Sequence, residues 1–258
     1  MYKAISPAEW RSHLGLAPDY RVDGCLFYGA PHTRKRYEML RDRLASLVRN
    51  VEYESLTGFF DPILPFRING RRVWFTTAYG GAALSEWLHV ACMLGSGINV
   101  LLGTCGGLYD GANTHDLIVP TYSWGDESTT RAYEPRADHR HHANESLGKS
   151  LAKRMRALGH RVWEGPTVTH QAMLAETWED VQNWSRDGFF GVEMEAATMF
   201  AVSNHFDVPA AAVVRVADNL IKDATVFDPA YRDATEQREA VTRDMFDAAL
   251  HDLLEFGR

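Results

Sequence analysis

The stretch INVLLGTCGG, residues 98–107, decides the fold class of this chain. It is an apolar run that ends in a cluster of glycines, a pattern typical of a strand buried on both faces. VPAAAVVRVAD at 208–218 has the same apolar character, and CLFYG at 25–29 also ends in glycine. Such strands occur in sheets that helices cover on both sides, so the sequence predicts an α/β protein.

Helical patterns alternate with these strands, and no repeat, low-complexity tract or linker interrupts them. We therefore expect a single domain over residues 1–258, a three-layer α/β/α arrangement, with a short capped helix at 6–14 as an N-terminal appendage. The other expected strands are 51–56, 63–70 and 71–81 (joined by an Asn69-Gly70 turn), 116–120, 161–169, and a brief strand passing into a helix over 191–206. The longer expected helices are 33–48, 82–95, 146–159, 175–187 and 234–256, and the polar stretch 121–145 is expected to be irregular.

Composition excludes several function classes. The 258 residues carry 34 acidic and 27 basic side chains, a net charge of −7, whereas a general nucleic-acid or anionic-membrane binder needs a basic excess. No stretch approaches ~18 consecutive apolar residues, and no signal-peptide core begins the sequence, so we expect a cytoplasmic protein. The three cysteines, Cys25, Cys92 and Cys105, have no metal-like spacing and are expected to be free, buried thiols.

Three loops are the expected places for chemistry, because ligands of such sheets bind beyond the carboxyl ends of the strands. They follow Gly29, span 103–107, and span 218–225. At 103–107 the glycines let successive backbone N–H groups converge on an anion or a carbonyl-rich ligand, and Thr104 adds a hydroxyl. The alternative is that this glycine-rich strand end is only a turn.

Two carboxylates occur in GVEMEAA, residues 191–197, inside an otherwise apolar run. Glu193 and Glu195 cannot both be buried without partners, because an unpaired buried charge is very costly. If Glu195 meets a ligand, a diol is the natural match, since one carboxylate accepts two short, charge-assisted hydrogen bonds. The alternative is an acidic helix start that suits the helix dipole.

Asp218 stands at the carboxyl end of the apolar strand 208–218. Partial burial there would raise its pKa and let it act as a general acid. The alternative is an ordinary loop aspartate or helix cap.

Together these segments resemble the nucleoside phosphorylase/nucleosidase superfamily of the purine nucleoside phosphorylase and uridine phosphorylase type. GVEMEAATMF at 191–200 is similar to its ribose-binding segment, and LLGTCGGL at 101–108 to the motif that approaches phosphate and base. The order of these motifs also matches, over about residues 23–256. The resemblance implies the nucleoside phosphorylase fold, with a central mixed and partly barrel-like sheet, and an enzyme that cleaves N-ribosyl bonds without a metal or organic cofactor.

The resemblance assigns roles at the sugar and at the leaving group. Glu195 would hold the 2′- and 3′-hydroxyls of the ribose, with Met194 against the sugar face and Glu193 at the same edge. Asp218 would protonate or hydrogen-bond N7 of a purine base, acting with Arg238. Such an acid relieves the negative charge that develops on the departing base.

The resemblance also assigns the walls of the site. The residues that would contact the base are Met173, Val192, Cys105 and Gly106. Those that would bind phosphate or a 5′-group are Gly29, Thr104, Arg34 and His32.

The expected phosphate loop departs from the family pattern. GAPHTR at 29–34 has Ala30 where an aspartate is usual and its arginine displaced to Arg34, and Leu101 stands where some members have a further arginine. The favoured interpretation is phosphorolysis of a nucleoside with a purine base, with inorganic phosphate as co-substrate. Two alternatives stay open: a phosphate-independent nucleosidase, similar to AMP nucleosidases, and a non-catalytic nucleoside-binding or storage protein.

Partners follow from the same resemblance. We expect a small-molecule nucleoside or nucleotide, no nucleic-acid polymer, no membrane, and a homo-oligomer of two to six subunits. The histidine-rich stretch 138–142 invites a zinc site, but its intervening arginine favours a solvated loop that holds no metal.

Overall fold

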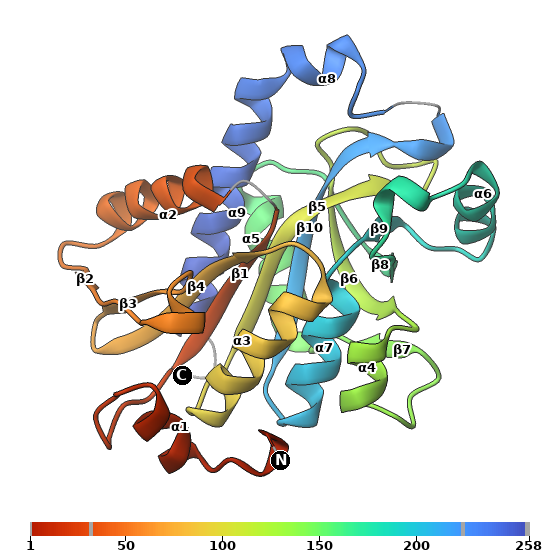
Figure 1. Ribbon diagram of the computed structural model, residues 1–258. Coiled ribbons are helices and arrows are strands. Elements are labelled where there is room, and N and C mark those ends of the chain that lie inside the picture. The colour runs from red at the N-terminus through yellow and green to blue at the C-terminus, as the bar shows by residue number, and fades with distance from the viewer. Residues whose placement is uncertain (1, 31–32, 223–224, 256–258) are drawn as a thin grey trace.

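The computed structural model of the chain describes residues 2–30, 33–222 and 225–255. Figure 1 shows a twisted central sheet with helices on both sides. The strands are β1 (Gly24–Gly29), β2 (Glu52–Tyr53), β3 (Leu64–Ile68), β4 (Arg71–Ala78), β5 (Asn99–Gly107), β6 (Leu117–Trp124), β7 (Arg140–His142), β8 (Val162–Thr169), β9 (Gly191–Glu193) and β10 (Ala210–Asn219).

The sheet is mixed and part of it closes on itself. The strand order is β10-β6-β8-β9-β5-β1-β4-β3-β2, with β7 paired to β6, and β10 also pairs with β5. Strands β5, β10, β6, β8 and β9 therefore form a closed, barrel-like ring, from which β1, β4, β3 and β2 extend. β1 is parallel to β4 and β5, and β10 is parallel to β5 but antiparallel to β6. The prediction of a mixed, partly barrel-like sheet is confirmed.

Helices cover both faces of this sheet, as predicted. The longer ones are α2 (Thr33–Leu47), α3 (Gly81–Met93), α5 (Glu145–Ala157), α6 (Trp178–Arg186), α7 (Ala196–His205) and α9 (Thr235–Glu255). The shorter helices are α1 (Pro7–His13), α4 (Ser128–Tyr133) and α8 (Pro229–Asp233), with 3-10 turns η1 (Tyr2–Ala4), η2 (Gly58–Phe60), η3 (Met173–Ala175) and η4 (Leu220–Lys222). In Figure 1, α3, α7 and α4 lie in front of the sheet, α5 and α9 lie behind it, and α2 lies at the left beside α9.

The apolar strands supply two cores, one on each face. On β10, Ala211 and Val213 belong to the cluster that contains Met245 and Phe246 of α9, whereas Ala212 belongs to the cluster on the α3 and α7 face. Successive side chains of a strand point to opposite faces, so a strand covered on both sides is apolar at most positions. This is the physical reason for the nearly continuous apolar run at 208–217, which only Arg215 interrupts.

The hairpin between β3 and β4 has the predicted turn. Ile68 pairs with Arg71, and the two residues between them, Asn69 and Gly70, have φ of 51° and 79°. Positive φ at both central positions gives a turn whose twist matches the strands, and asparagine and glycine adopt it at low cost.

Four expected elements differ from the structure. The stretch 121–145 is ordered, because β6 continues to Trp124 and is followed by α4 and β7. Its polar character reflects buried hydrogen bonds, such as the one that Ser123 Oγ donates to Glu193 Oε1 at 2.9 Å. Strand 51–56 shortens to β2, helix 175–187 begins only at Trp178, and the expected loop at 103–107 is the end of β5. The expected helix 234–256 is present as α9, with the short α8 before it.

Two further expectations concern the cysteines and the membrane. Cys25, Cys92 and Cys105 are free and buried, as predicted. Across the described ranges, no helix has both the length and the apolar character that a bilayer crossing needs.

Candidate functional site

A cavity of about 410 Å³ opens at the carboxyl ends of β1, β5 and β10. All three segments chosen from the sequence reach it, through Gly29, Thr104 to Gly106, and Asp218 with Thr225 to Phe227, although 103–107 belongs to strand β5 and is not a loop. The start of α7 and the segment from η3 into α6 complete the wall. This is the edge at which open α/β sheets bind ligands.

Glu193 is buried and its carboxyl group is fully engaged by the protein. Oε1 accepts hydrogen bonds from Ser123 Oγ at 2.9 Å and Thr169 Oγ1 at 2.5 Å. Oε2 accepts the backbone N–H groups of Glu195 at 2.7 Å and Ala196 at 2.6 Å. These last two are N–H groups at the start of α7, which have no partner inside the helix. Glu193 thus borders the cavity but works mainly as the clamp that fixes the turn into α7.

Glu195 is the carboxyl group of this pair that the turn presents to the cavity. It is 5 % exposed, and its Oε1 accepts the backbone N–H of Gly80 at 2.6 Å. Its Oε2 lies against Gly29, where an added Cβ would be only 2.5 Å away. Glycine at 29 is therefore needed to leave room for this carboxyl group.

The surroundings of Glu195 favour the protonated form of its carboxyl group. Burial above all, and then the carboxyl group of Glu193, raise its pKa to about 8, against the opposing effect of the Gly80 N–H. A ligand that donates two hydroxyl hydrogen bonds would stabilise the ionised form instead.

Asp218 also lines the cavity, at an irregularity in the pairing of β10 with β5 between Val216 and Asp218. It is 8 % exposed, and its Oδ2 accepts the backbone N–H of Val226 at 3.0 Å. Burial raises its pKa to about 6, although the Val226 N–H and the positive charge of Arg215 lower it. A carboxyl group with such a pKa can hold a proton near neutral pH and donate it.

Close packing at 105–106 shapes the wall next to Asp218. Cys105 and Val192 are buried and line the cavity, and burial raises the pKa of the Cys105 thiol, so it remains protonated there. A Cβ on Gly106 would lie 2.6 Å from Leu220 Cδ1 and 3.2 Å from Val192 Cγ1. Met173 also lines the cavity but is 43 % exposed, which places it at the mouth.

The residues expected to bind phosphate or a 5′-group are only partly brought together. Gly29 and Thr104 line the cavity. Arg34 does not: its side chain is 93 % exposed and its Nε donates to Glu38 Oε1 at 2.8 Å, one helical turn along α2. His32 lies outside the described residues.

Arg238 is also absent from the cavity wall. Its Nη2 donates to Thr235 Oγ1 at 2.8 Å, and its guanidinium group lies 4.0 Å above the ring of Tyr231. These partners, close to it in sequence, hold the side chain at the α8–α9 junction. The positive charge that lowers the pKa of Asp218 is instead that of Arg215 on β10. The Arg215 side chain is 3 % exposed, and the sequence analysis did not single it out.

Other lining residues were also missed, among them Tyr79, Leu174, Glu176, Trp178 and Phe227. For Glu176, the sequence contains a pattern that could have placed it outside the helix. Thr177 and Asp180 form a capping box, in which each side chain accepts the other's backbone N–H. That spacing fixes the start of α6 at Trp178 and leaves Glu176 outside the helix.

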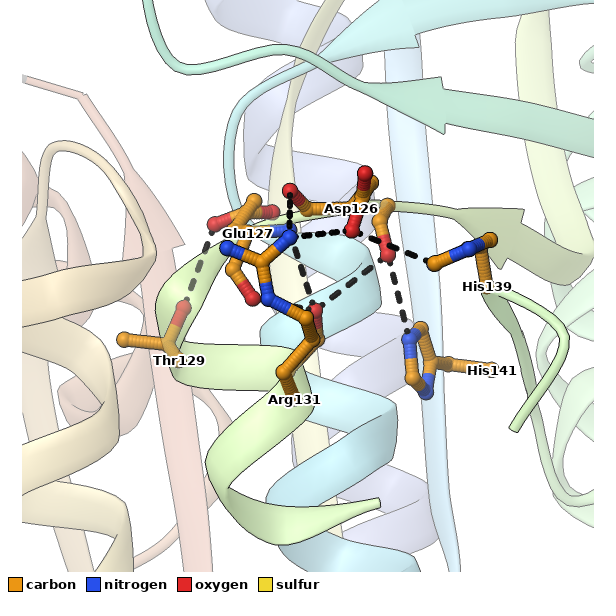
Figure 2. Close-up of polar contacts among 8 residues, drawn as sticks. Asp126, Glu127, Thr129, Arg131, His139 and His141 are labelled. Carbon is orange, nitrogen blue, oxygen red and sulfur yellow. Dashed lines mark hydrogen bonds and ion pairs between the residues drawn. The ribbon is translucent and has the colours of Figure 1, made fainter. Parts of the chain in front are cut away.

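A fourth, partly buried carboxyl group belongs to Glu127, the N-cap residue of α4 (Figure 2). Glu127 Oε2 accepts a hydrogen bond from Thr129 Oγ1 at 3.2 Å. Burial, and then the charge of Glu193, raise the pKa of Glu127 to about 7. The turn before α4 and the turn before α7 therefore bring two acidic side chains near each other.

The histidine-rich stretch 138–142 is only in part the expected solvated loop, because 140–142 form the short strand β7, in which His141 is buried while Arg140 and His142 are exposed. His141 of β7 is 2 % exposed, and its Nδ1 lies 2.5 Å from Glu134 Oε2 (Figure 2). His139 Nδ1 lies 3.3 Å from Asp126 Oδ1. Each histidine faces a different carboxylate. In the portion of the chain that the structure covers, no cluster of three His, Cys, Asp or Glu side chains could hold a metal ion.

Comparison with known proteins agrees with this geometry. The family model described as "Phosphorylase superfamily" matches residues 50–251. A guanosine phosphorylase of Halorubrum lacusprofundi is 29 % identical over 123 residues, which are 46 % of this chain and 49 % of that protein. A DeoD-type purine nucleoside phosphorylase of Colwellia psychrerythraea is 24 % identical over 155 residues, 60 % of this chain and 63 % of that one. The matches thus span about half to three fifths of these relatives.

A solved structure is similar over a longer range. Uridine phosphorylase of Vibrio fischeri superposes with a TM-score of 0.69 at 17 % sequence identity, over 91 % of each chain. At this identity the similarity concerns the fold alone, and it agrees with the sheet described above.

Proposed function

This chain belongs to the phosphorylase superfamily, and from that premise we propose that it cleaves the N-glycosidic bond of a purine nucleoside by phosphorolysis. One observation carries the proposal. A single cavity is lined by two buried carboxyl groups, Glu195 and Asp218, and burial raises the pKa of Asp218 to about 6. In this proposal Glu195 holds the sugar diol and Asp218 is the acid at the base. These are the two groups that bond cleavage between a sugar and a base requires.

The sugar lies at the Glu195 side. Its two hydroxyl groups donate to the ionised carboxylate, while Gly80 N–H and the Glu193 clamp hold that carboxylate in place. Met194 lines the same part of the cavity. A fixed sugar reaches the geometry of reaction without losing further orientational freedom, which accelerates the chemical step.

The base lies at the Asp218 side, among Cys105, Gly106, Val192 and Met173. When the bond between the ribosyl carbon and N9 breaks, its electron pair goes to the base. The proton of Asp218 passes to N7, or is shared with it, and the base leaves neutral. A phosphate oxygen forms the new bond to the ribosyl carbon, so the products are free base and ribose 1-phosphate.

Phosphate is the co-substrate in this proposal, and no organic cofactor takes part. The Gly29 loop and the Thr104 hydroxyl are the groups that would receive it. The acidic lining favours one alternative, hydrolysis, in which water replaces phosphate: among the described lining residues none is Arg, Lys or His, whereas Glu176, Glu193, Glu195 and Asp218 all carry carboxyl groups.

A second copy of the chain supplies the missing cation in the phosphorolytic proposal. The cavity mouth carries exposed apolar side chains, Leu174 at 89 % and Phe227 at 77 %. Exposed apolar groups around a site are typical of surfaces that another molecule covers. Light scattering at micromolar concentration tests the expected homo-oligomer.

The central experiment is product analysis. The protein is incubated with purine and pyrimidine nucleosides and with AMP, with and without phosphate, and the products are separated. Free base plus sugar 1-phosphate, formed only with phosphate, supports the proposal. Free ribose formed without phosphate replaces it with the hydrolytic alternative. Ligand binding without any release of base overturns both.

A further inference from the structure

Three basic side chains, Arg215, His115 and Arg238, lie between β10 and the first turns of α9 and form what we call the basic layer. Arg215 follows Val213 by two residues and so points to the same face of β10. Val213 belongs to the apolar core under α9, and so does Val241, one helical turn after Arg238. Where this core ends, arginines therefore replace apolar side chains.

His115 is brought to the layer by the backbone of β10. Its N–H donates to Val216 O at 2.9 Å, and Nη1 of Arg215 donates to the same oxygen at 3.3 Å. Burial, and then the charges of Arg215 and Arg238, lower the pKa of His115. The shared carbonyl group and this influence agree that the three basic groups are close together.

The basic layer keeps donors without acceptors in the described part of the chain. Arg215 is 3 % exposed, yet its Nε has no hydrogen-bond partner, and Arg238 Nη1 and His115 Nδ1 also have none. The contacts that the two arginines do make go to uncharged oxygens, Val216 O and Thr235 Oγ1. A buried guanidinium group without a counter-charge is costly, so the layer needs an anion.

The acids next to the layer in sequence are engaged by other groups. Glu239, the residue after the layer's arginine on α9, forms ion pairs with Lys35 at 2.8 Å and Arg36 at 2.9 Å. Asp116, the residue after the layer's histidine, accepts a hydrogen bond from Trp163 Nε1 at 3.0 Å. These acids therefore do not supply the counter-charge.

We propose that the basic layer binds an oxyanion of the phosphate type, either inorganic phosphate or the phosphate group of a nucleotide. A guanidinium group presents its donors as a planar fork that matches two oxygens of such an anion. The first turn of the 21-residue α9 adds the positive end of a helix dipole. His115 and Arg238 are partly exposed and none of the three lines the nucleoside cavity, so the anion enters from the surface.

Calorimetric titration with inorganic phosphate compares the wild type with Arg215→Met and with Arg243→Met as the matched control. Arg243 is an exposed side chain of α9. Arg215→Met is expected to raise the Kd of phosphate about tenfold or more, because a charged fork of donors is lost. Arg215→Lys, which keeps the charge without the fork, is expected to lie in between, and Arg243→Met to bind like the wild type. An unchanged Kd in Arg215→Met overturns the inference.

Thermal unfolding separates an anion site from an arginine that only supports the fold. Without phosphate, Arg215→Met is expected to melt at or above the wild-type temperature, since a buried charge without a partner is removed. Phosphate is expected to raise the melting temperature of the wild type and not that of Arg215→Met. A variant that melts below the wild type without phosphate would make Arg215 a structural residue and overturn the inference.

Diffraction from crystals soaked in arsenate, whose anomalous scattering marks its position, locates the oxyanion. A peak between Arg215 and Arg238 supports the inference, and a peak only at Thr104 in the cavity overturns it.

Titration with AMP and adenosine identifies the source of the oxyanion. If Arg215→Met weakens the binding of AMP but not of adenosine, the layer holds the phosphate group of a nucleotide; if it weakens only inorganic phosphate, the layer holds the free anion. None of these measurements requires cleavage of a nucleoside, so failure of the proposed function leaves this test intact.

Discussion

The carboxylate of Glu193 accepts the backbone N–H of Glu195, two residues later, at 2.7 Å. The same oxygen accepts the N–H of Ala196 at 2.6 Å, so the clamp fixes the first residues of α7. The two acidic residues of this motif, Glu193 and Glu195, therefore have different roles. One carboxyl group is used up in shaping the turn, and the turn then presents the other to the cavity.

Substituting these two acids separates their roles. Glu195→Gln is expected to raise KM at least tenfold for ribonucleosides, because one acceptor for the diol becomes a donor. It should also reduce the preference for ribo- over 2′-deoxyribonucleosides, with the melting temperature nearly unchanged. Steady-state kinetics with both substrate types measure this effect. Unchanged KM and unchanged preference would remove Glu195 from the sugar site.

Glu193→Gln is expected to lower the free energy of unfolding. The amide replaces an acceptor that faces two backbone N–H groups or two hydroxyl groups, so at least one buried donor loses its partner. Such a loss costs about 1–3 kcal/mol. Denaturant unfolding measures it, and a variant as stable as the wild type would contradict the clamp.

Asp218→Asn is expected to lower kcat for purine nucleosides by about 10²- to 10⁴-fold, the usual contribution of a general acid. The control is 7-methylguanosine, whose base already carries the positive charge that protonation would supply. Its cleavage should fall far less in the variant. An equal fall for both substrates would mean that Asp218 does not donate a proton.

The pH profile of kcat/KM is expected to be a broad bell. Activity needs ionised Glu195, with a pKa of about 8, and protonated Asp218, with a pKa of about 6. As pH increases, the product of these two fractions rises until about pH 6, stays constant between the two pKa values and falls above about pH 8. Glu195→Gln should abolish the rise at low pH and leave only a fall that begins near pH 6. A variant that keeps the acidic limb would exclude Glu195 as its source.

Gly29→Ala is expected to reduce kcat/KM about tenfold or more, because overpacking displaces the Glu195 carboxyl group that its Cβ would approach to 2.5 Å. Gly103→Ala is the matched control, since the nearest atom to a Cβ there, Val214 Cγ1, is 3.7 Å away. Equal activity in the two variants would contradict the close contact between Gly29 and Glu195.

Folding stability is expected to fall as pH rises from about 5 to 8. Glu127 has a folded pKa of about 7, above the usual value of 4.5, so the folded state binds more protons than the unfolded state in this window. Its stabilising effect is complete below pH 4.5 and is lost as pH passes 7. Glu127→Gln removes at most about 1.4 kcal/mol per pH unit from this slope, as urea unfolding at several pH values will show. If the free energy of unfolding of Glu127→Gln depends on pH as steeply as that of the wild type, groups other than Glu127 cause the pH dependence.

Local patterns in the sequence were sufficient for most strands of the sheet, the hairpin turn and part of the cavity wall. Continuous apolar runs such as 208–218 reveal strands covered on both faces, because burial on each side constrains every residue. The glycine cluster after the strand at 98–107 and Asp218 at a strand end lie where strand direction alone puts them, at the ligand-binding edge.

Long-range contacts decided the rest. The pairing of β10 with β5 closes the ring, and no local pattern encodes it. Whether Glu193 or Glu195 is free depends on Ser123 and Thr169, which come from distant strands. Arg34 and Arg238 find partners close to them in sequence and do not reach the cavity wall, whereas Glu176 reaches it. The sequence by itself determined the fold class and several of the chemical groups that line the cavity, among them Glu193, Glu195 and Asp218. Only the tertiary structure decided which of those groups remain available, because hydrogen-bond partners and burial are properties of the packed chain.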